Sequence, residues 1–377
     1  MKTSRTPNNW TNILFFSLTP LLAIAGIYWL YASGRGVPAA TWVLTAIGLY
    51  ATGLGITSGY HRLFAHKTYD APWPIRLFFL VITSGSFEGS ALEWSSDHRT
   101  HHRFVDTDKD PYNIKAGFWF AHIGWLFKRP SPPLLYDNVT DLLRDPLIRF
   151  QHRYYIPLAI LVSFGIPTLI ASLWGDPWGG FFVAGVTRMV FNHHATFCIN
   201  SVCHYLGTQP YSDRHTGRDS WITAIFTYGE GYHNYHHEFP GDYRNGIRAW
   251  HWDPGKWLIY GLKKVGLARN LKKVQPDRIF QARLEMDEKK LVQKLATHPG
   301  LAKIDWHHLV SKNRQRLIDA HAHFLKLKQD YKRLKSEKMD YVADQMEKVH
   351  AEIQKARENF ERSLTEWRML LRNPVVA

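Results

Sequence analysis

Three short clusters of histidines are the residues of this chain that most clearly predict chemistry. They hold eight of its 21 histidines, namely His61 and His66, then His98, His101 and His102, then His233, His236 and His237. In the second and third clusters, a histidine is followed three and four positions later by a histidine pair, so each cluster can aim three imidazoles at one point from one helical face. Neutral imidazole is the commonest protein metal ligand and binds iron, zinc and copper. Because a zinc site needs only four ligands, eight converging nitrogens predict two metal ions.

Two further residues extend this candidate metal set. Asn200 and His204 are four apart and share a helical face. We expect His204 to be a ninth ligand and Asn200 to hold a water on the second metal. His61 and His66 are five apart, which does not place them on one face of an α-helix. They converge only if the helix ends or distorts between them.

Four apolar segments indicate where the clusters lie. Residues 13–31, 38–60, 154–174 and 179–202 each approach the roughly 20 apolar residues that cross a bilayer. They form two pairs joined by short turns, which predicts two transmembrane hairpins. Two shorter apolar segments, 75–91 and 116–127, flank the second cluster and fit helices at the membrane surface. The sequence therefore predicts an all-α integral membrane protein with four transmembrane helices in two hairpins and a helical cap that holds the metal site.

The distribution of charge gives the expected orientation. The formal net charge is +15, and the turns inside the hairpins carry almost no positive residues, whereas the segment between the hairpins and the C-terminal part are basic. By the positive-inside rule, both termini and the metal site lie on the cytoplasmic side. Four spans argue against a nucleic-acid-binding protein, and the expected anionic partner is membrane lipid or an anionic substrate carrier. Cys198 and Cys203 end the last span, where we expect them to pack without a disulfide.

The composition changes near residue 276, which divides the chain into a membrane domain, 1–276, and a C-terminal helical extension, 277–377. Residues 306–371 contain no proline or glycine. Apolar residues in the extension follow the spacing of a coiled coil, and they are Val342, Met346, Val349, Ile353, Ala356, Phe360, Leu364, Trp367 and Leu371. One long helix or an antiparallel hairpin near Lys338 satisfies this pattern. The seam must pack against itself, a second copy or another protein, so we expect a stabilising appendage or a homo-oligomer.

The clusters and their flanking residues resemble the membrane acyl-CoA desaturases of the stearoyl-CoA (delta-9) type, over roughly residues 40–270. Besides the histidines, the matching residues are Glu93-Trp94, Asp97, Asp110-Pro111, His122-Ile123-Gly124-Trp125, Asn200-Ser201 and Gly229-Glu230-Gly231. The resemblance implies two iron ions held by the nine histidines, with Asn200 acting through water. It also implies that a cis double bond is introduced at the delta-9 position of a long-chain fatty acyl group carried on coenzyme A.

Dioxygen is then a co-substrate, and an external donor (ferredoxin, cytochrome b5 or a reductase) supplies electrons. No catalytic residue beyond the metal centre is expected, because the irons and dioxygen carry the difficult step. We expect five residues at the substrate. Gly53 would leave room for the acyl tail, Trp94 would line the tunnel, and Asp97 lies beside the second cluster, while Lys128 and Arg129 match the headgroup position. Glu93 and Asp97 are also expected to orient imidazoles.

Two other functions fit part of the pattern. A membrane hydroxylase or alkane monooxygenase uses the same histidine-rich di-iron chemistry and differs in the fate of the substrate radical. A zinc-binding membrane protein or transporter is the non-enzymatic alternative, and it predicts polar residues along the spans. Here the histidine clusters lie at the expected cytoplasmic ends of the spans, and their spacing and flanking residues favour the desaturase.

Overall fold

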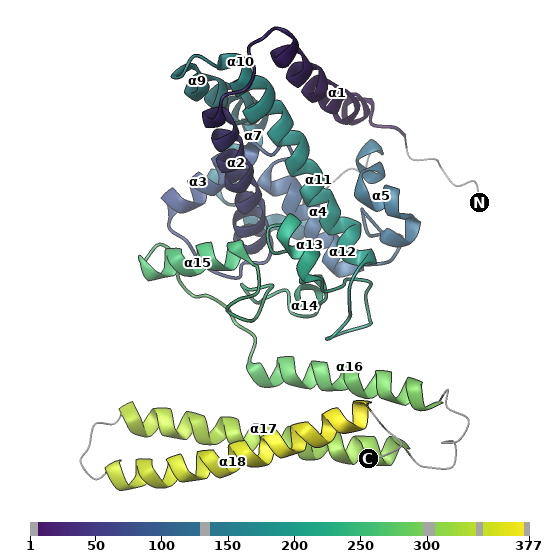
Figure 1. Ribbon diagram of the computed structural model, residues 1–377, viewed down its shortest axis with the longest axis vertical. Coiled ribbons are helices and arrows are strands. Elements are labelled where there is room, and N and C mark those ends of the chain that lie inside the picture. Colours follow the sequence, from purple (N-terminus) through teal and green to yellow (C-terminus); the bar gives the residue numbers. More distant parts are fainter. Residues whose placement is uncertain (1–6, 129–135, 297–305, 337–341, 373–377) are drawn as a thin grey trace. The chain divides into compact units, whose positions relative to one another are not determined.

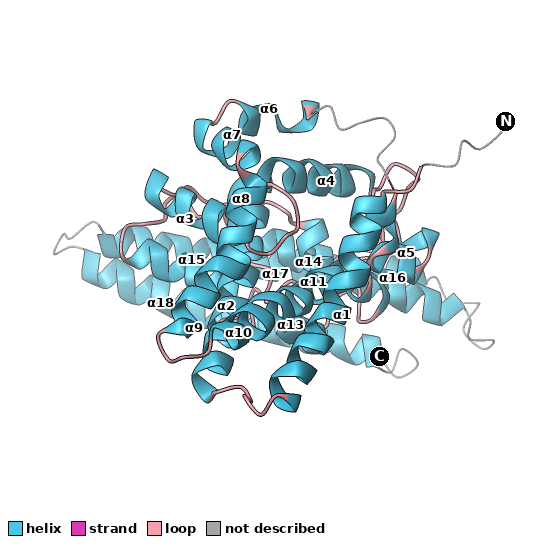
Figure 2. Cartoon of the chain, turned by 90° about the horizontal axis from the view of Figure 1, so that it is seen from above, coloured by secondary structure: helices cyan, strands magenta, loops and turns pink. Residues whose placement is uncertain are grey.

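The structure is a computed structural model of the chain that describes residues 7–128, 136–296, 306–336 and 342–372. Within these ranges the chain is built from helices and loops, with only isolated β-bridges between short segments (Figure 2). The predicted all-α fold is therefore confirmed for the described residues. The chain forms two compact units, one of Met1–Gln209 with Arg214–Lys273 and the other of Pro210–Asp213 with Val274–Ala377.

The first unit contains all three histidine clusters. Its helices up to the second cluster are α1 (Trp10–Ala32), α2 (Ala39–Leu54), η1 (Gly55–Ala65), α3 (Trp73–Ser84) and α4 (Ala91–Phe104). Short helices follow, namely η2 (Ile114–Ala116), α5 (Phe118–His122), η3 (Gly124–Phe127), η4 (Asp137–Val139), α6 (Thr140–Leu143) and α7 (Pro146–Arg153). The remaining helices are α8 (Tyr155–Ile160), η5 (Leu161–Gly165), α9 (Ile166–Ser172), α10 (Pro177–Gly179), η6 (Gly180–Thr187), α11 (Arg188–Asn200), α12 (Val202–Tyr205), α13 (Trp221–Phe226), α14 (His233–Glu238) and α15 (Pro254–Lys264).

Three helices in the described residues are long and apolar enough to cross a membrane. They are α1, the continuous helix Ala39–Ala65 formed by α2 and η1, and the helix Tyr155–Ser172 formed by α8, η5 and α9. They correspond to the first three expected spans. Large apolar side chains such as Ile24, Ile47 and Leu169 are more than half exposed on them, which suits contact with lipid.

The fourth expected span is a continuous helix, Pro177–Asn200, but it does not reach the apolarity of the other three. Its polar residues contact the rest of the unit. Arg188 is buried and donates hydrogen bonds to the Gly85 carbonyl oxygen at 2.7 Å and to the Ser163 hydroxyl at 3.0 Å. Length and composition therefore identify three spans where four were expected, because one face of this helix is polar and packs inside the unit.

The helix that carries the first cluster changes from α to π geometry at Gly55. In a π-helix each N–H bonds to the carbonyl oxygen five residues earlier. The His66 N–H donates to the His61 carbonyl oxygen at 3.0 Å at the end of η1. Two histidines that are five apart therefore come to one face, with ring centroids 4.8 Å apart. This is the helix distortion that their spacing predicted.

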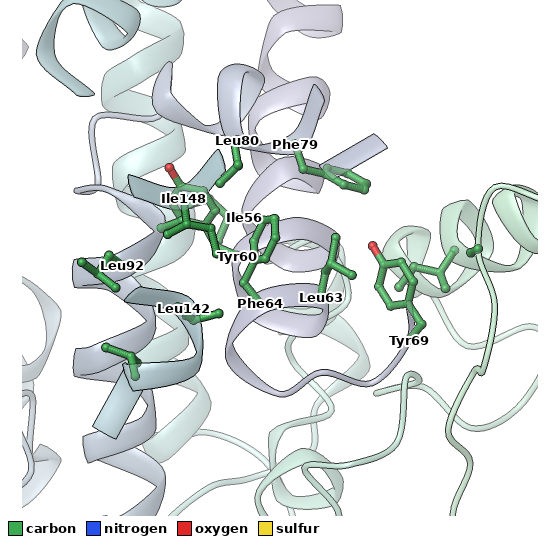
Figure 3. Packing of buried hydrophobic residues seen from close by; sticks show 14 of the residues in the cluster. Ile56, Tyr60, Leu63, Phe64, Tyr69, Phe79, Leu80, Leu92, Leu142 and Ile148 are labelled. Atoms are coloured by element: carbon green, nitrogen blue, oxygen red, sulfur yellow. The ribbon is translucent and has the colours of Figure 1, made fainter. Parts of the chain in front are cut away.

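The same π-helix packs into the apolar core of the first unit (Figure 3). The core includes Ile56, Tyr60, Leu63 and Phe64 of η1, Phe79 and Leu80 of α3, Leu92 of α4 and Ile148 of α7. Burying each large apolar side chain contributes about 1.5–3 kcal/mol. The core thus holds η1 and α4 together, and with them the first and second histidine clusters.

The second unit contains three long helices, α16 (Pro276–Ala296), α17 (Trp306–Ser336) and α18 (Val342–Arg372). α17 and α18 lie side by side (Figure 1), and Phe324 stacks on Phe360 while Tyr331 contacts His350. These pairs show that the two helices run antiparallel. Of the two arrangements predicted for the extension, the structure has the hairpin.

The apolar seam of α18 packs against the other two helices of its own unit. The core comprises Leu284, Leu291 and Leu295 of α16, Val310 and Leu317 of α17, and Trp367 and Leu370 of α18, with Phe360, Leu364 and Leu371 packed against it. The side chain of Val342, the first residue of the predicted seam, lies outside the described part of the chain. From Phe360 onward the seam is therefore covered within the chain and needs no second copy there.

We predict that Trp367→Ala unfolds the second unit without loss of the metal site. Trp367 is 2% exposed, and removing a buried tryptophan costs about 3–5 kcal/mol. The matched control is Met369→Ala, because Met369 is 53% exposed on the same helix. Limited proteolysis of the full-length protein in detergent should show new cleavages within 276–372 only for the tryptophan variant. Equal protease resistance of the two variants would contradict the assigned core.

Candidate metal centre

The structure brings the nine expected histidine ligands together as two groups. The first, the five-histidine group, comprises His61, His66, His98, His102 and His236. The second, the four-histidine group, comprises His101, His204, His233 and His237. Within each group, one nitrogen from every residue lies within 4.8 Å of the others.

The two helical clusters divide their histidines between the groups, although we expected each cluster to aim at one point. On α4, His98 and His102 join the five-histidine group and His101 joins the other. On α14, His233 and His237 join the four-histidine group and His236 joins the other. In both helices the pair that stays together is four apart, because such residues differ by only about 40° around the helix axis. Each cluster therefore bridges the two groups.

The spacing of the ring nitrogens fits one metal ion for each group. Neighbouring Nε2 atoms lie 2.8–3.0 Å apart in the five-histidine group and 3.0–3.2 Å apart in the four-histidine group. Two imidazoles that bind one metal at about 2.1 Å and at right angles place their nitrogens about 3.0 Å apart. All of these nitrogens are of the same type, so each ring turns its Nδ1 outward, where another group can fix it.

A carboxylate fixes one ring of the five-histidine group. Glu230 lies in the loop before α14, and its Oε2 is 3.2 Å from His61 Nδ1. The other Glu230 oxygen accepts from Arg62 at 3.1 Å, and Arg62 also pairs with Asp253 at 2.9 Å. Burial alone would raise the pKa of Glu230, but His61 and Arg62 outweigh burial and hold that pKa well below its usual range. Glu230 therefore stays ionised and can accept the Nδ1 proton, which leaves Nε2 of His61 free for a metal.

Two carboxylates serve the four-histidine group. Asp110 Oδ1 is 2.9 Å from His101 Nδ1, and both side chains are buried. His204 Nδ1 is 2.8 Å from the Thr216 hydroxyl, which in turn donates to Asp106 at 2.6 Å. Both rings thus have an oxygen partner on the side that faces away from the shared nitrogens.

Burial keeps the other imidazoles neutral. Burial is the main cause that lowers the pKa of these rings well below the usual value, and neighbouring histidines add to it. The rings are those of His98, His102, His204, His236 and His237. The same causes lower the pKa of His66, and they lower that of His233 to about 3. A neutral imidazole is the form that binds a metal, so near neutral pH these rings are ready to do so.

A cavity of about 990 Å³ extends from these histidines. At the metal end, its wall includes His61, His98, His101 and His233, together with Asn200. Trp94 also lines the cavity, and its ring stacks on that of His98 with centroids 4.7 Å apart. Asp97 lines it as well, and burial, with a smaller effect of Glu93, raises the pKa of Asp97 to about 7.

Away from the metal end, the walls of the cavity differ in character. Aromatic side chains form one part of the wall, with Phe15 and Phe16 of α1 beside Phe197 of α11. Lys109 and Lys128 lie on another part, and both are exposed. The cavity thus combines apolar walls with cationic groups that solvent can reach.

The other expected residues are Gly53, Arg129 and Glu93. Gly53 is buried and is not among the residues that line the cavity; a Cβ there would overlap the ring of Tyr228. Arg129 lies outside the described residues. Glu93 lines the cavity and accepts from the Ser90 N–H and hydroxyl, each at 2.9 Å. It therefore completes the capping box that begins α4, and within the described residues it has no hydrogen bond to any of the nine histidines.

Sequence reasoning did not assign the groups that hold the rings in place. Glu230 and Asp110 belong to the motifs that resemble the desaturases, but that resemblance did not indicate what the two residues do. Asp106 and Thr216 are 110 positions apart in the sequence, and no local pattern connects them. His194 lies outside both histidine groups and pairs with His122 at 3.1 Å.

We predict that Glu230→Gln weakens metal binding at the five-histidine group by about 10–100-fold, the usual effect of losing an outer partner of a ligand. The variant removes the anion that accepts from His61 and balances Arg62. Chelator competition on the purified protein would measure the metal affinity. Glu285→Gln, at an exposed position of α16, is the control that should bind as the unmodified protein does. Unchanged affinity in Glu230→Gln would contradict this role.

Comparison with known proteins agrees with this geometry. The model of the fatty acid desaturase family matches residues 36–256, a range that includes all nine histidines. The chain is 45% identical over 302 residues to acyl-CoA desaturase 1 of Saccharomyces cerevisiae, which covers 79% of this chain and 57% of that protein. It is 37% identical over 274 residues to stearoyl-CoA desaturase 5 of Bos taurus, covering 70% of this chain and 79% of the relative.

A third relative is the delta(9)-fatty-acid desaturase fat-6 of Caenorhabditis elegans, 38% identical over 269 residues that cover 70% of this chain and 78% of that protein. The chain spans less than two thirds of the length of the yeast relative. The family match nevertheless covers more than half of the chain, and the identity to the animal relatives extends over most of their length. The chain therefore belongs to the fatty acid desaturase family, and its apolar helices mark it as a membrane protein of that family.

Proposed function

We propose that this chain is an oxygen-dependent desaturase that introduces a cis double bond at the delta-9 position of a long-chain fatty acyl-CoA, at a centre of two irons. Two groups of buried and half-buried histidines lie at one end of a cavity with apolar walls, and members of both groups line that cavity. The names of the relatives support the acyl-CoA carrier and the delta-9 position.

The histidines would hold one iron in each group. Imidazole nitrogen suits iron. Asn200 lines the cavity, as do His101 and His233 of the four-histidine group, and it would act on the second iron through water. When bound, the irons would supply the reductive activation of dioxygen that is needed to break an unactivated C–H bond. The residues of the chain contribute geometry: Glu230 and Asp110 fix the proton of a ligand ring on its outer nitrogen, so that the inner nitrogen carries a lone pair.

The cavity would hold the acyl chain in one path past the histidines. Its volume of about 990 Å³ lies at the upper end of the roughly 300–1,000 Å³ typical of small-molecule pockets. Trp94 packs on His98 and forms part of the wall, so it would press one stretch of the acyl chain toward the metal end. The position of the double bond then follows from which carbon atoms lie there, and the aromatic walls exclude water from them.

The two lysines of the cavity would face the anionic carrier. Lys128 donates to the Asn8 side chain at 2.9 Å, so its ammonium group is held where α1 approaches η3. Lys109 follows α4 on the cavity wall. Coenzyme A carries phosphate groups, and exposed lysines attract these as point charges. Asp97 also lines this cavity and would lie beside the acyl path.

The proposal includes four membrane spans, with Pro177–Asn200 as the fourth, and both termini and the metal centre on the cytoplasmic side. One charged residue, Arg188, lies in the fourth helix and is buried against the protein, where a charge is tolerated in a membrane protein. Electrons would come from an external donor such as ferredoxin, cytochrome b5 or a reductase. The helices α16 to α18 would serve self-association or docking of that donor.

A membrane hydroxylase is the second candidate function, because the same metal centre would suit it. Expression of the chain in cells that lack delta-9 desaturase activity, followed by gas chromatography of their fatty acids, separates the two. A new cis monounsaturated fatty acid supports the desaturase, and a hydroxylated product supports the alternative. A membrane zinc protein would yield neither product.

We predict that His101→Ala and His236→Ala each abolish the new fatty acid and lower the iron content. Each residue belongs to a different histidine group, so both groups are tested. His323→Ala, at an exposed position of α17, is the matched control and should retain full activity. Iron analysis and gas chromatography of the same preparations would measure both effects. Normal desaturation by either active-site variant would refute the di-iron assignment.

We also predict that Lys128→Glu raises the KM for acyl-CoA while iron content and kcat stay unchanged. The increase should be up to roughly thirty-fold, since reversing the charge removes an exposed ion pair of about 1 kcal/mol or less and adds a repulsion of similar size. It should shrink at high salt. Lys263→Glu, an exposed position on α15 away from the cavity lining, is the control of equal charge change. Equal KM values for the two variants would exclude Lys128 from the headgroup site.

A further inference from the structure

The loop between α4 and η2 carries three aspartates within five residues, Asp106, Asp108 and Asp110. Asp110 and Asp106 approach the four-histidine group, Asp110 directly and Asp106 through Thr216. Asp108 is exposed. The loop thus places two carboxylates behind one of the two histidine groups, and Asp106 has no role in the function proposed above.

Asp106 holds Thr216 with both of its carboxylate oxygens. Oδ1 accepts from the Thr216 hydroxyl at 2.6 Å, and Oδ2 accepts from the Thr216 backbone N–H at 2.7 Å. Two hydrogen bonds to one residue fix both the position of Thr216 and the direction of its hydroxyl proton. The hydroxyl oxygen then has a lone pair left to accept a third hydrogen bond.

His204 supplies the donor for that lone pair. Its Nδ1 lies 2.8 Å from the Thr216 hydroxyl oxygen. Because the hydroxyl proton is already committed to Asp106, the bond requires a proton on Nδ1 of His204. The neutral ring then carries its lone pair on Nε2, and that atom lies 3.0 Å from His233 Nε2, inside the four-histidine group. The chain of contacts therefore selects the tautomer of His204 that can bind a metal there.

The backbone of the loop is shaped to make this contact. Asp106 has a φ of 64°, a left-handed conformation that aspartate tolerates better than most residues. Its own N–H donates to Asp110 Oδ2 at 3.1 Å, while Asp110 Oδ1 faces His101. A residue held in this sparsely populated region is over-determined by its surroundings. Here Asp106 is held on two sides, by the hydrogen bond from its N–H to Asp110 and by the hydrogen bonds from Thr216 to its carboxylate.

The five-histidine group depends on a different part of the chain. Its carboxylate is Glu230, which Arg62 and Asn245 hold through buried hydrogen bonds. No hydrogen bond of the described residues links that network to Asp106 or Thr216. A change at Thr216 should therefore act on one group and leave the other intact.

We propose that Asp106 is a positioning residue for the four-histidine group and acts on His204 through the Thr216 hydroxyl. The proposal rests on the proposed function only in that the groups hold metal ions. It assigns Asp106 and Thr216 no contact with the substrate and no part in proton transfer. Without the contact from Asp106 through Thr216 to His204, the metal of the four-histidine group would be held less tightly, and the metal of the other group would not be affected.

The test compares Thr216→Val with Thr216→Ser in the full-length protein. Valine has nearly the shape of threonine but can neither accept from His204 nor donate to Asp106, whereas serine keeps both bonds. After dialysis against a weak chelator, iron per chain should fall from about two to about one in the valine variant, because loss of an outer partner weakens a metal about 10–100-fold. The serine variant should keep both irons.

A spectroscopic reading identifies which iron is lost. Protein loaded with 57Fe should give two ferrous Mössbauer doublets, because the two groups differ in the number of their histidines. The valine variant should lose one doublet and retain the other. Thr83→Val is the matched control, since Thr83 is buried and its hydroxyl has no hydrogen-bond partner among the described residues. It should retain both doublets.

Asp106→Asn provides a second variant in case valine at Thr216 prevents folding. The amide can still accept from the Thr216 hydroxyl but presents a donor to the Thr216 N–H, so the same iron should be weakened to a smaller extent. Two irons and two doublets in both variants, or equal loss of both irons, would overturn the proposal. Unmodified protein that binds two irons but desaturates no fatty acyl substrate would instead overturn the proposed function and leave the role of Asp106 intact.

Discussion

Nine imidazoles, six of them buried and three half-buried, must lie close together while remaining neutral and correctly turned. Burying a polar ring without a partner is unfavourable, and a ring with the wrong tautomer cannot bind a metal. The fold meets the first requirement by packing η1 and α4 on a shared apolar core. It meets the second with oxygen atoms behind the rings, from Glu230, Asp110 and Thr216. Helix packing and ligand orientation are thus separate tasks, performed by different residues.

This division explains which parts of the site the sequence could predict. The four-residue spacing of His98 and His102 is a local property of a helix, and it correctly indicated that they act together. The five-residue spacing of His61 and His66 indicated a distortion, which the structure shows as a π-helix. By contrast, Thr216 reaches His204 from a loop, and Asp106 reaches Thr216 from another loop 110 positions away. Contacts between loops leave no periodic pattern, so they could not be predicted.

The helices show the same difference: the sequence predicts which face of a helix is apolar, but not which residues cover that face. The spacing in α18 predicted an apolar seam, but spacing does not say what covers it; the structure shows Trp367 and Leu370 packed on α16 and α17. In the first unit, apolar length predicted four spans, and three of the corresponding helices are apolar enough to cross a membrane. The fourth is less apolar because Arg188 bonds to Gly85 and Ser163 within the protein. A hydropathy pattern averages over both faces of a helix and cannot separate a buried polar face from an exposed one.

The two histidine groups also differ in the charges that surround them. Behind the five-histidine group, Glu230 and Asp253 share the cation Arg62, so this network carries about one net negative charge. Behind the four-histidine group, the two carboxylates of Asp106 and Asp110 accept from backbone N–H groups, a hydroxyl and an imidazole. These donors are neutral when the imidazole is neutral, so that network carries about two negative charges. A dication held by the group with fewer histidines would therefore lie nearer to more negative charge. The four-histidine group has one histidine fewer but about one more negative charge behind it. These two differences offset each other, so both groups can favour the same ion.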